Sequence, residues 1–174
     1  MLYAKTIFFN FVYLDDNYLI LDLQHFIKNP ANIIKSFSED VFISSLDNYY
    51  RPIFTISLIF NALIAGTSPY LYHLTNVLIH VLACCLLFLL LTELDYKREL
   101  SFVAALFFTI RPVLTQAVAW VPGRNDSLMA VFFNCVFLLF SALFKTRESK
   151  KSYFLHLLFF LLALLTKESA LFFP

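Results

Sequence analysis

The chain has 174 residues and a formal net charge of +1, and 60% of its residues are hydrophobic, 22 of them phenylalanine. With a mean hydropathy of +0.76, this composition exceeds what a water-soluble domain of that length needs. It indicates an all-α polytopic membrane protein. No basic cluster with interleaved aromatic residues is present, so no nucleic-acid partner is expected. The two glycines are too few for a phosphate-binding loop or a dinucleotide fingerprint.

The N-terminal residues 1–14 are largely apolar and lead into an adjacent carboxylate pair, Asp15 and Asp16. A membrane-spanning helix needs about 20 residues, so residues 1–14 are expected to form only the end of a first helix. Residues 169–174 begin another apolar run that stops with the chain. The sequence is therefore expected to be the N-terminal part of a longer transmembrane domain.

Residues 15–69 mix polar and apolar side chains and predict a loop of short helices at the membrane interface. Apolar residues at helical spacing predict two short amphipathic helices, over 19–26 and 33–41, separated near Pro30. The apolar run 52–66 is too short to span a bilayer, so we expect it to lie at the interface or to dip into the membrane.

Four later segments predict membrane helices. They are residues 70–94, 100–123, 127–144 and 152–166. Within the second of them, Arg111 is followed by Pro112, which lacks a backbone N–H and predicts a break. Broken membrane helices occur where they line a cavity.

Positive charge predicts the orientation of these helices. The connection after the first is basic at Lys97 and Arg98, and the one after the third carries Lys145, Arg147, Lys150 and Lys151, so both are expected to be cytoplasmic. Alternation then places the loop 15–69, the turn 111–126 and the Lys167-Glu168 pair together on the non-cytoplasmic face.

An ordered set of short motifs extends over nearly the whole chain. The set is Tyr13-Leu-Asp-Asp16, Tyr50-Arg-Pro52, Gly66-Thr-Ser-Pro69, Tyr72-His-Leu-Thr-Asn76, His80, Arg111-Pro112, Ala117-Val-Ala-Trp-Val121, Gly123-Arg-Asn-Asp126 and Leu165-Thr-Lys-Glu-Ser169. It resembles the GT-C glycosyltransferases, above all the transmembrane and tetratricopeptide-repeat proteins that O-mannosylate other proteins, with their bacterial relatives. Two positions depart from the family pattern: Arg111 stands where a histidine usually precedes the proline, and Gln116 where a glutamate is common.

The resemblance implies an inverting enzyme that transfers a sugar from a polyprenyl phosphate carrier to a hydroxyl acceptor on protein, at the non-cytoplasmic face of the membrane. The C-terminal tetratricopeptide repeats of that family are absent from this sequence. The expected location is a bacterial inner membrane rather than the endoplasmic reticulum. Transfer to a lipid or a glycan, a transporter segment and a non-catalytic membrane fragment are the alternatives.

The carboxylate pair is the expected catalytic group, because two adjacent acids at a membrane boundary need a cation, a metal or a substrate beside them. One of Asp15 and Asp16 would accept the proton of the acceptor hydroxyl, with Asp16 favoured. The other would orient the acceptor or hold a divalent metal. No cofactor is otherwise expected.

The remaining expected site residues would bind the donor phosphate or the substrate. They are Arg51, His73, Arg111, Arg124, Asp126, Lys167 and Glu168. We expect Asp15, Asp16, Arg51, Arg124 and Lys167 to line one non-cytoplasmic cavity, since an unpaired charge beside hydrocarbon is costly. Simpler interpretations stay open: Asp126 as a helix cap, Lys167 with Glu168 as a surface ion pair, and Trp120 with the tyrosines as an interfacial aromatic belt.

Overall fold

The computed structural model describes residues 3–13, 15–43, 49–146 and 150–172. Over these ranges the chain forms helices and no strand, and two of the helices are long and apolar enough to cross a membrane, or up to three spans if the bent pair α5–α6 is counted as one. The predicted class, an all-α membrane protein, is confirmed. Arg147, and the parts of the expected segments 1–14, 15–69 and 169–174 that fall in the gaps, lie outside the described residues.

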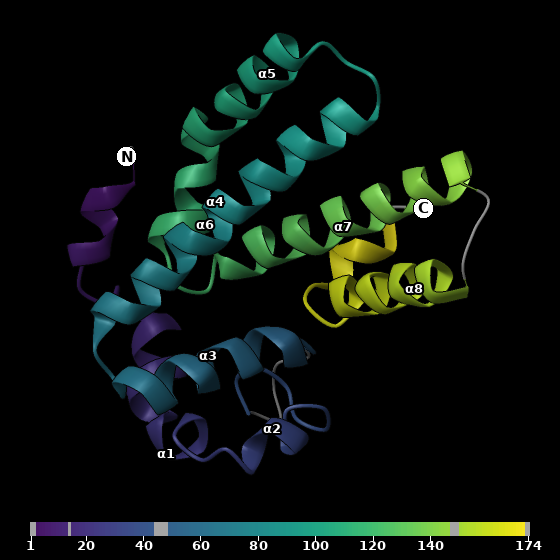
Figure 1. Ribbon diagram of the computed structural model, residues 1–174. Coiled ribbons are helices and arrows are strands. Elements are labelled where there is room, and N and C mark those ends of the chain that lie inside the picture. Colours follow the sequence, from purple (N-terminus) through teal and green to yellow (C-terminus); the bar gives the residue numbers. More distant parts are fainter. Residues whose placement is uncertain (1–2, 14, 44–48, 147–149, 173–174) are drawn as a thin grey trace.

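The long helices form the upper part of the molecule in Figure 1. They are α4 (Pro69–Glu93), α5 (Arg98–Ile110), α7 (Arg124–Thr146) and α8 (Lys150–Leu164). Helix α4 packs against both α5 and α7, and α7 packs against α8. Leucine, phenylalanine and alanine dominate these segments, so they carry apolar surface around most of their circumference, as membrane helices do.

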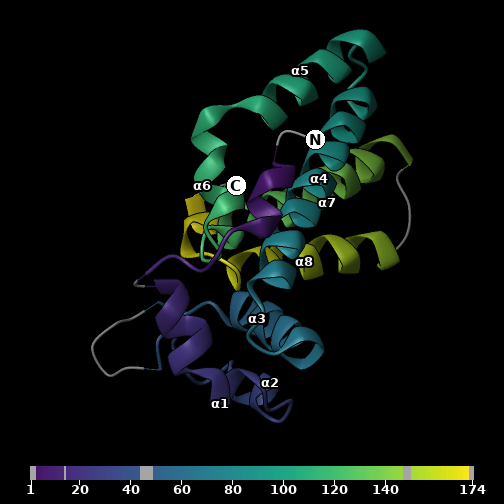
Figure 2. The same cartoon turned by 90° about the vertical axis from the view of Figure 1, so that its left-hand side faces the viewer.

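The helix after α4 is broken where the sequence predicts it. Helix α5 ends at Ile110, Arg111 is extended, and Pro112 opens a short 3-10 turn, η3 (Pro112–Leu114), that leads into α6 (Thr115–Ala119). The axis bends by 54° across this break. The bend directs α6 away from α5, as Figure 2 shows, and brings the chain to the start of α7.

Gly123 allows α6 and the start of α7 to approach one another. A Cβ atom at this position would lie 2.3 Å from the carbonyl oxygen of Gln116 and 2.9 Å from the Cα atom of Ala117. Both are backbone atoms that cannot rotate away, so only glycine fits here. The close contact fixes where α7 begins, and therefore where the polar residues of its first turn lie.

The remaining helices of the described chain are short. They are η1 (Ala4–Phe8), the π-helical turn η2 (Asn17–Asp22), α1 (Gln24–Ile27), α2 (Asn32–Lys35) and α3 (Pro52–Ala65), with η4 (Glu168–Phe172) following α8. Those from η2 to α3 form the lower part of the molecule in Figure 1. A core of Ile20, Ile27, Phe54 and Leu58 joins η2, α1 and α3 to Val121 before α7.

Two expectations about these elements differ from the structure. Residues 1–14 do not end a long helix: their described part forms the 3-10 helix η1, and Phe9 then continues in extended conformation. The second amphipathic helix ends at Lys35 instead of reaching 41. In both places tertiary contacts override helical periodicity, since η1 packs against α4 and Val41 joins the core around α3.

The prediction from charge requires the α4–α5 and α7–α8 connections to lie on the same side of the membrane. In Figure 1 the α4–α5 turn, the end of α7 and the start of α8 lie at one end of the bundle, whereas α3, α6 and the start of α7 lie toward the other. The starts of α5 and α8, which carry Arg98, Lys150 and Lys151, thus lie at one end of the bundle.

Labelling of introduced cysteines should reveal which end faces the cytoplasm. In a variant without native cysteines, an impermeant thiol reagent added from the non-cytoplasmic side should label Lys28→Cys and leave Lys150→Cys unlabelled until the membrane is permeabilised. Both side chains are exposed, so accessibility within the protein is matched. Labelling of Lys150→Cys alone would reverse the orientation.

Candidate functional site

A pocket of about 250 Å³ lies between the loop 15–69, the start of α7 and the turn after α8. Four of the residues expected at the site line it: Asp15, Arg51, Asp126 and Lys167. Aromatic and small residues complete the wall, namely Leu19, Val41, Phe42, Tyr49, Phe54, Trp120, Pro122, Gly123 and Asn125. We call this cavity the polar pocket. Of the five residues expected to share one cavity, Asp15, Arg51 and Lys167 do so.

Both cations of the polar pocket are paired with carboxylates. Arg51 donates from Nε (3.0 Å) and Nη2 to the two carboxylate oxygens of Glu168, and its guanidinium lies 4.8 Å from the ring centre of Tyr49. This hydrogen-bonded pairing lowers the pKa of Glu168. Lys167 forms an ion pair with Asp126. Such half-exposed pairs are weak, so a phosphate entering the pocket can compete with the carboxylates for both cations.

The two acids of the carboxylate pair have different surroundings. Asp15 lines the polar pocket, whereas Asp16 is fully buried behind it. Oδ2 of Asp16 accepts a hydrogen bond from the Val12 N–H (2.9 Å), and its Oδ1 has no hydrogen-bond partner among the described residues. Burial raises the pKa of Asp16, with a further increase from the Asp15 carboxylate, and attraction to Arg124 opposes the shift.

The raised pKa of Asp16 predicts a pH dependence of stability. The native state favours the protonated acid more than the unfolded chain does, so stability is lost as pH rises from about 4, the ordinary aspartate pKa, through the raised value. The melting temperature of Asp16→Asn should therefore rise relative to that of the wild type as pH increases. The exposed Asp22→Asn should show no such trend, and parallel melting curves for wild type and Asp16→Asn would contradict this prediction.

Arg124, expected at the phosphate, is instead an internal clamp. Its side chain is fully buried. Its guanidinium donates to Asn76 Oδ1 (2.6 Å), to the Ser57 hydroxyl (3.0 Å) and to the Tyr72 carbonyl (3.0 Å), which joins α7 to α4 and α3. Asn76 in turn donates to the carbonyl of Trp120 (3.0 Å). These contacts hold the wall of the polar pocket in place without exposing Arg124 to it.

Two further expected residues lie outside the polar pocket. His73 is buried in the first turns of α4 among the rings of Phe9 and Phe11, and neither ring nitrogen has a hydrogen-bond partner among the described residues. Arg111 is exposed at the break after α5. Glu168 contributes to the site through Arg51, and Asp126 lies in the first turn of α7 rather than capping it.

The arrangement does not favour the divalent metal considered for the carboxylate pair. Within the described part of the chain, no group of three or more histidine, cysteine, aspartate or glutamate side chains comes together as metal ligands. Only Asp15 of the pair reaches the pocket, and the second carboxylate there, Asp126, is paired with Lys167.

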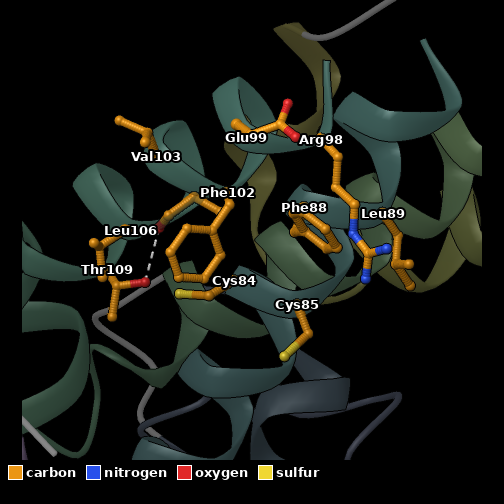
Figure 3. A pocket seen from close by; sticks show the side chains of 11 residues that line it. Cys84, Cys85, Phe88, Leu89, Arg98, Glu99, Phe102, Val103, Leu106 and Thr109 are labelled. Carbon is orange, nitrogen blue, oxygen red and sulfur yellow. Dashed lines mark hydrogen bonds between the residues drawn. The ribbon is translucent and has the colours of Figure 1, made fainter. Parts of the chain in front are cut away.

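A larger cavity of about 780 Å³ lies between α4 and α5 and contains none of the expected site residues. Figure 3 shows its wall, with Cys84, Cys85 and Phe88 from α4 facing Phe102 and Thr109 from α5. Apart from Arg98 and Glu99 at the start of α5, this wall offers little polar chemistry. It does not compete with the polar pocket as a catalytic site.

Sequence reasoning missed Asn125 and assigned Trp120 and Tyr49 to an aromatic belt, although all three line the polar pocket. Asn125 lies inside the motif Gly123-Arg-Asn-Asp126, between two charged residues that were themselves expected at the site. Its position directly before Asp126 could have indicated that it lines the same pocket. Trp120 and Tyr49 carry no signal that separates a pocket wall from a membrane interface.

The amino-acid sequence of the chain is similar to those of proteins that are named protein O-mannosyl-transferases. The chain is 38% identical to protein O-mannosyl-transferase TMTC1 of Mus musculus over 51% of its length, and 31% identical to TMTC3 of the same species over 80%. It is 30% identical to Tmtc1 of Drosophila melanogaster over 98%. The chain spans only 10%, 15% and 20% of these three proteins, respectively.

No protein-family model matches the chain, and no solved structure matches it significantly. The three relatives are animal proteins, so they give no support to a bacterial inner membrane. They do support the resemblance that the ordered motifs predict, and one of them aligns with almost the entire chain. The chain is thus a relative of the TMTC proteins, which are named protein O-mannosyl-transferases.

Proposed function

We propose that the protein transfers a sugar from a polyprenyl-phosphate-linked donor to a hydroxyl group on a protein acceptor, at the non-cytoplasmic face of the membrane. The observation that carries the proposal is the meeting of Asp15, Arg51 and Lys167 in one pocket, from three distant parts of the chain. A carboxylate beside two cations is the set that this transfer requires. The names of the relatives favour a protein as acceptor over a lipid or a glycan.

In the proposed reaction Asp15 is the general base. The acceptor hydroxyl attacks the anomeric carbon of the sugar, its proton passes to the Asp15 carboxylate, and the bond from that carbon to the phosphate oxygen breaks. Attack opposite the leaving group inverts the anomeric configuration. Asp15 is preferred to Asp16 because it lines the pocket, whereas Asp16 is buried and hydrogen-bonded to the backbone at Val12. This choice reverses the preference drawn from the sequence.

Arg51 and Lys167 are proposed to stabilise the phosphate, which needs charge neutralisation rather than a proton to leave. Arg51 already uses two of its donors on the carboxylate of Glu168, and that geometry suits two phosphate oxygens equally well. Binding of the donor would exchange Glu168 and Asp126 for phosphate oxygens. The released carboxylates would remain close enough to return when the polyprenyl phosphate departs.

The test is sugar transfer from a polyprenyl-phosphate hexose to a serine- or threonine-containing peptide, with the protein reconstituted in lipid. Arg51→Met and Lys167→Met should each raise the KM for the donor about tenfold or more, since each removes charge-assisted hydrogen bonds. Lys28→Met, which removes an exposed cation paired only with Gln24 among the described residues, is the matched control. Unchanged KM in both variants would refute the phosphate site, and wild type without transfer would refute the function.

A further inference from the structure

The polar pocket is too small for a whole lipid-linked donor. Its volume of about 250 Å³ is below the range of about 300–1,000 Å³ found for pockets that enclose drug-sized ligands. A polyprenyl tail is far too long to fit in this volume, and charged groups form part of the wall. The pocket fits one small polar ring.

The wall of the polar pocket includes aromatic rings beside hydrogen-bonding groups. Trp120, Tyr49 and Phe42 contribute aromatic side chains, and Asp15 and Asp126 contribute carboxylates. A pyranose has a face of C–H groups, which suits the electron-rich face of an aromatic ring, and an edge of hydroxyls, which donate to carboxylates and amides. The composition of this wall therefore matches a sugar better than it matches a phosphate alone.

The side chain of Asn125 independently indicates that a hydrogen-bond donor binds in the polar pocket. The residue lines the polar pocket, is only 4% exposed, and its Oδ1 accepts no hydrogen bond from the described residues. A buried amide oxygen without a donor is unfavourable, so such groups normally have a partner. Its neighbours fix it there, because Gly123 sets the start of α7 and Arg124 clamps that start to α4.

We infer that the polar pocket is the subsite for the transferred monosaccharide, with the Asn125 carboxamide accepting a hydrogen bond from a sugar hydroxyl and Trp120 contributing to the aromatic wall. The inference rests on the proposed function and extends it by naming the residues that bind the sugar. Arg51 and Lys167 lie at the same pocket and would hold the phosphate attached to that sugar. Asp15 is then beside the ring, where the acceptor hydroxyl arrives.

The test compares two phosphodiesters of equal charge, one with a sugar and one without. The protein in lipid nanodiscs is titrated calorimetrically with a short-chain polyprenyl-phosphate mannose and with the methyl ester of the same polyprenyl phosphate, which serves as the bare lipid. Wild type should bind the mannosyl lipid more tightly. Asn125→Ala should reduce that preference about tenfold and leave the affinity for the bare lipid unchanged.

Two variants control for folding and for chemistry. Asn125→Asp keeps an acceptor oxygen and should retain most of the preference, and Asn134→Ala, which removes a hydrogen bond to the Ala83 carbonyl elsewhere on α7, should retain all of it. If Asn125→Ala does not fold, Trp120→Leu provides a second test, because this substitution should also weaken the preference for the mannosyl lipid.

The outcomes separate this inference from the proposed function. A preference that survives both Asn125→Ala and Trp120→Leu in a protein that still transfers sugar overturns the subsite and leaves the function standing. A preference that depends on Asn125 in a protein without transfer activity supports the subsite and overturns the function. Equal wild-type affinity for the two lipids overturns the subsite directly.

Discussion

Replacing Asp15 with asparagine should lower kcat for sugar transfer by about 10²–10⁴, the contribution typical of a general base. Asparagine keeps the size of the side chain and its polar contacts with the pocket but cannot accept the hydroxyl proton. Because the substitution removes a proton acceptor and no cation, the KM for the lipid-linked donor should change little. Steady-state kinetics with the reconstituted protein separates the two constants.

Two other aspartates test the assignment. Asp22→Asn changes an exposed acid of the same loop, outside the polar pocket, and should leave kcat unchanged. Asp16→Asn should reduce kcat less than Asp15→Asn, because Asp16 reaches the pocket only through its neighbours. A larger loss of kcat in Asp16→Asn would instead identify Asp16 as the base, as the sequence favours. Full activity in the double variant would show that the acidic pair is structural.

The helical architecture followed closely from the sequence because its signals are local. Apolar runs in α4 and α7 are long enough to span a bilayer whatever surrounds them, and the missing N–H of Pro112 favours a break in the helix between them. The shared pocket of Asp15, Arg51 and Lys167 was also predictable, since the alternation of spans expected from the sequence would place all three segments on one face.

The parts that the sequence could not predict depend on contacts between distant segments. An arginine that binds phosphate and one that clamps helices look identical in a sequence, and only the positions of Ser57, Tyr72 and Asn76 show that Arg124 is a clamp. The 3-10 conformation of η1 likewise depends on its packing against α4. The burial of His73 depends on its contacts with the rings of Phe9 and Phe11.

Replacing Arg124 with methionine should destabilise the protein by about 3–5 kcal/mol, the cost typical of removing one partner from a buried charged network. Methionine fills similar space but donates no hydrogen bond. The variant leaves Asn76 Oδ1, the Ser57 hydroxyl and the Tyr72 carbonyl without the donor that now holds them. It also removes the positive charge that attracts the buried Asp16 carboxylate. Chemical denaturation in detergent micelles measures the loss.

A double-mutant cycle identifies which part of this loss is electrostatic. Asp16→Asn in the Arg124→Met background should restore part of the stability, because it removes the buried carboxylate left without its cation. Arg98→Met, at an exposed arginine on α5, should cost less than about 0.5 kcal/mol and controls for loss of charge alone. If Arg124→Met were as stable as Arg98→Met, the guanidinium would not be clamping α3, α4 and α7, and Arg124 would again be available to bind a phosphate.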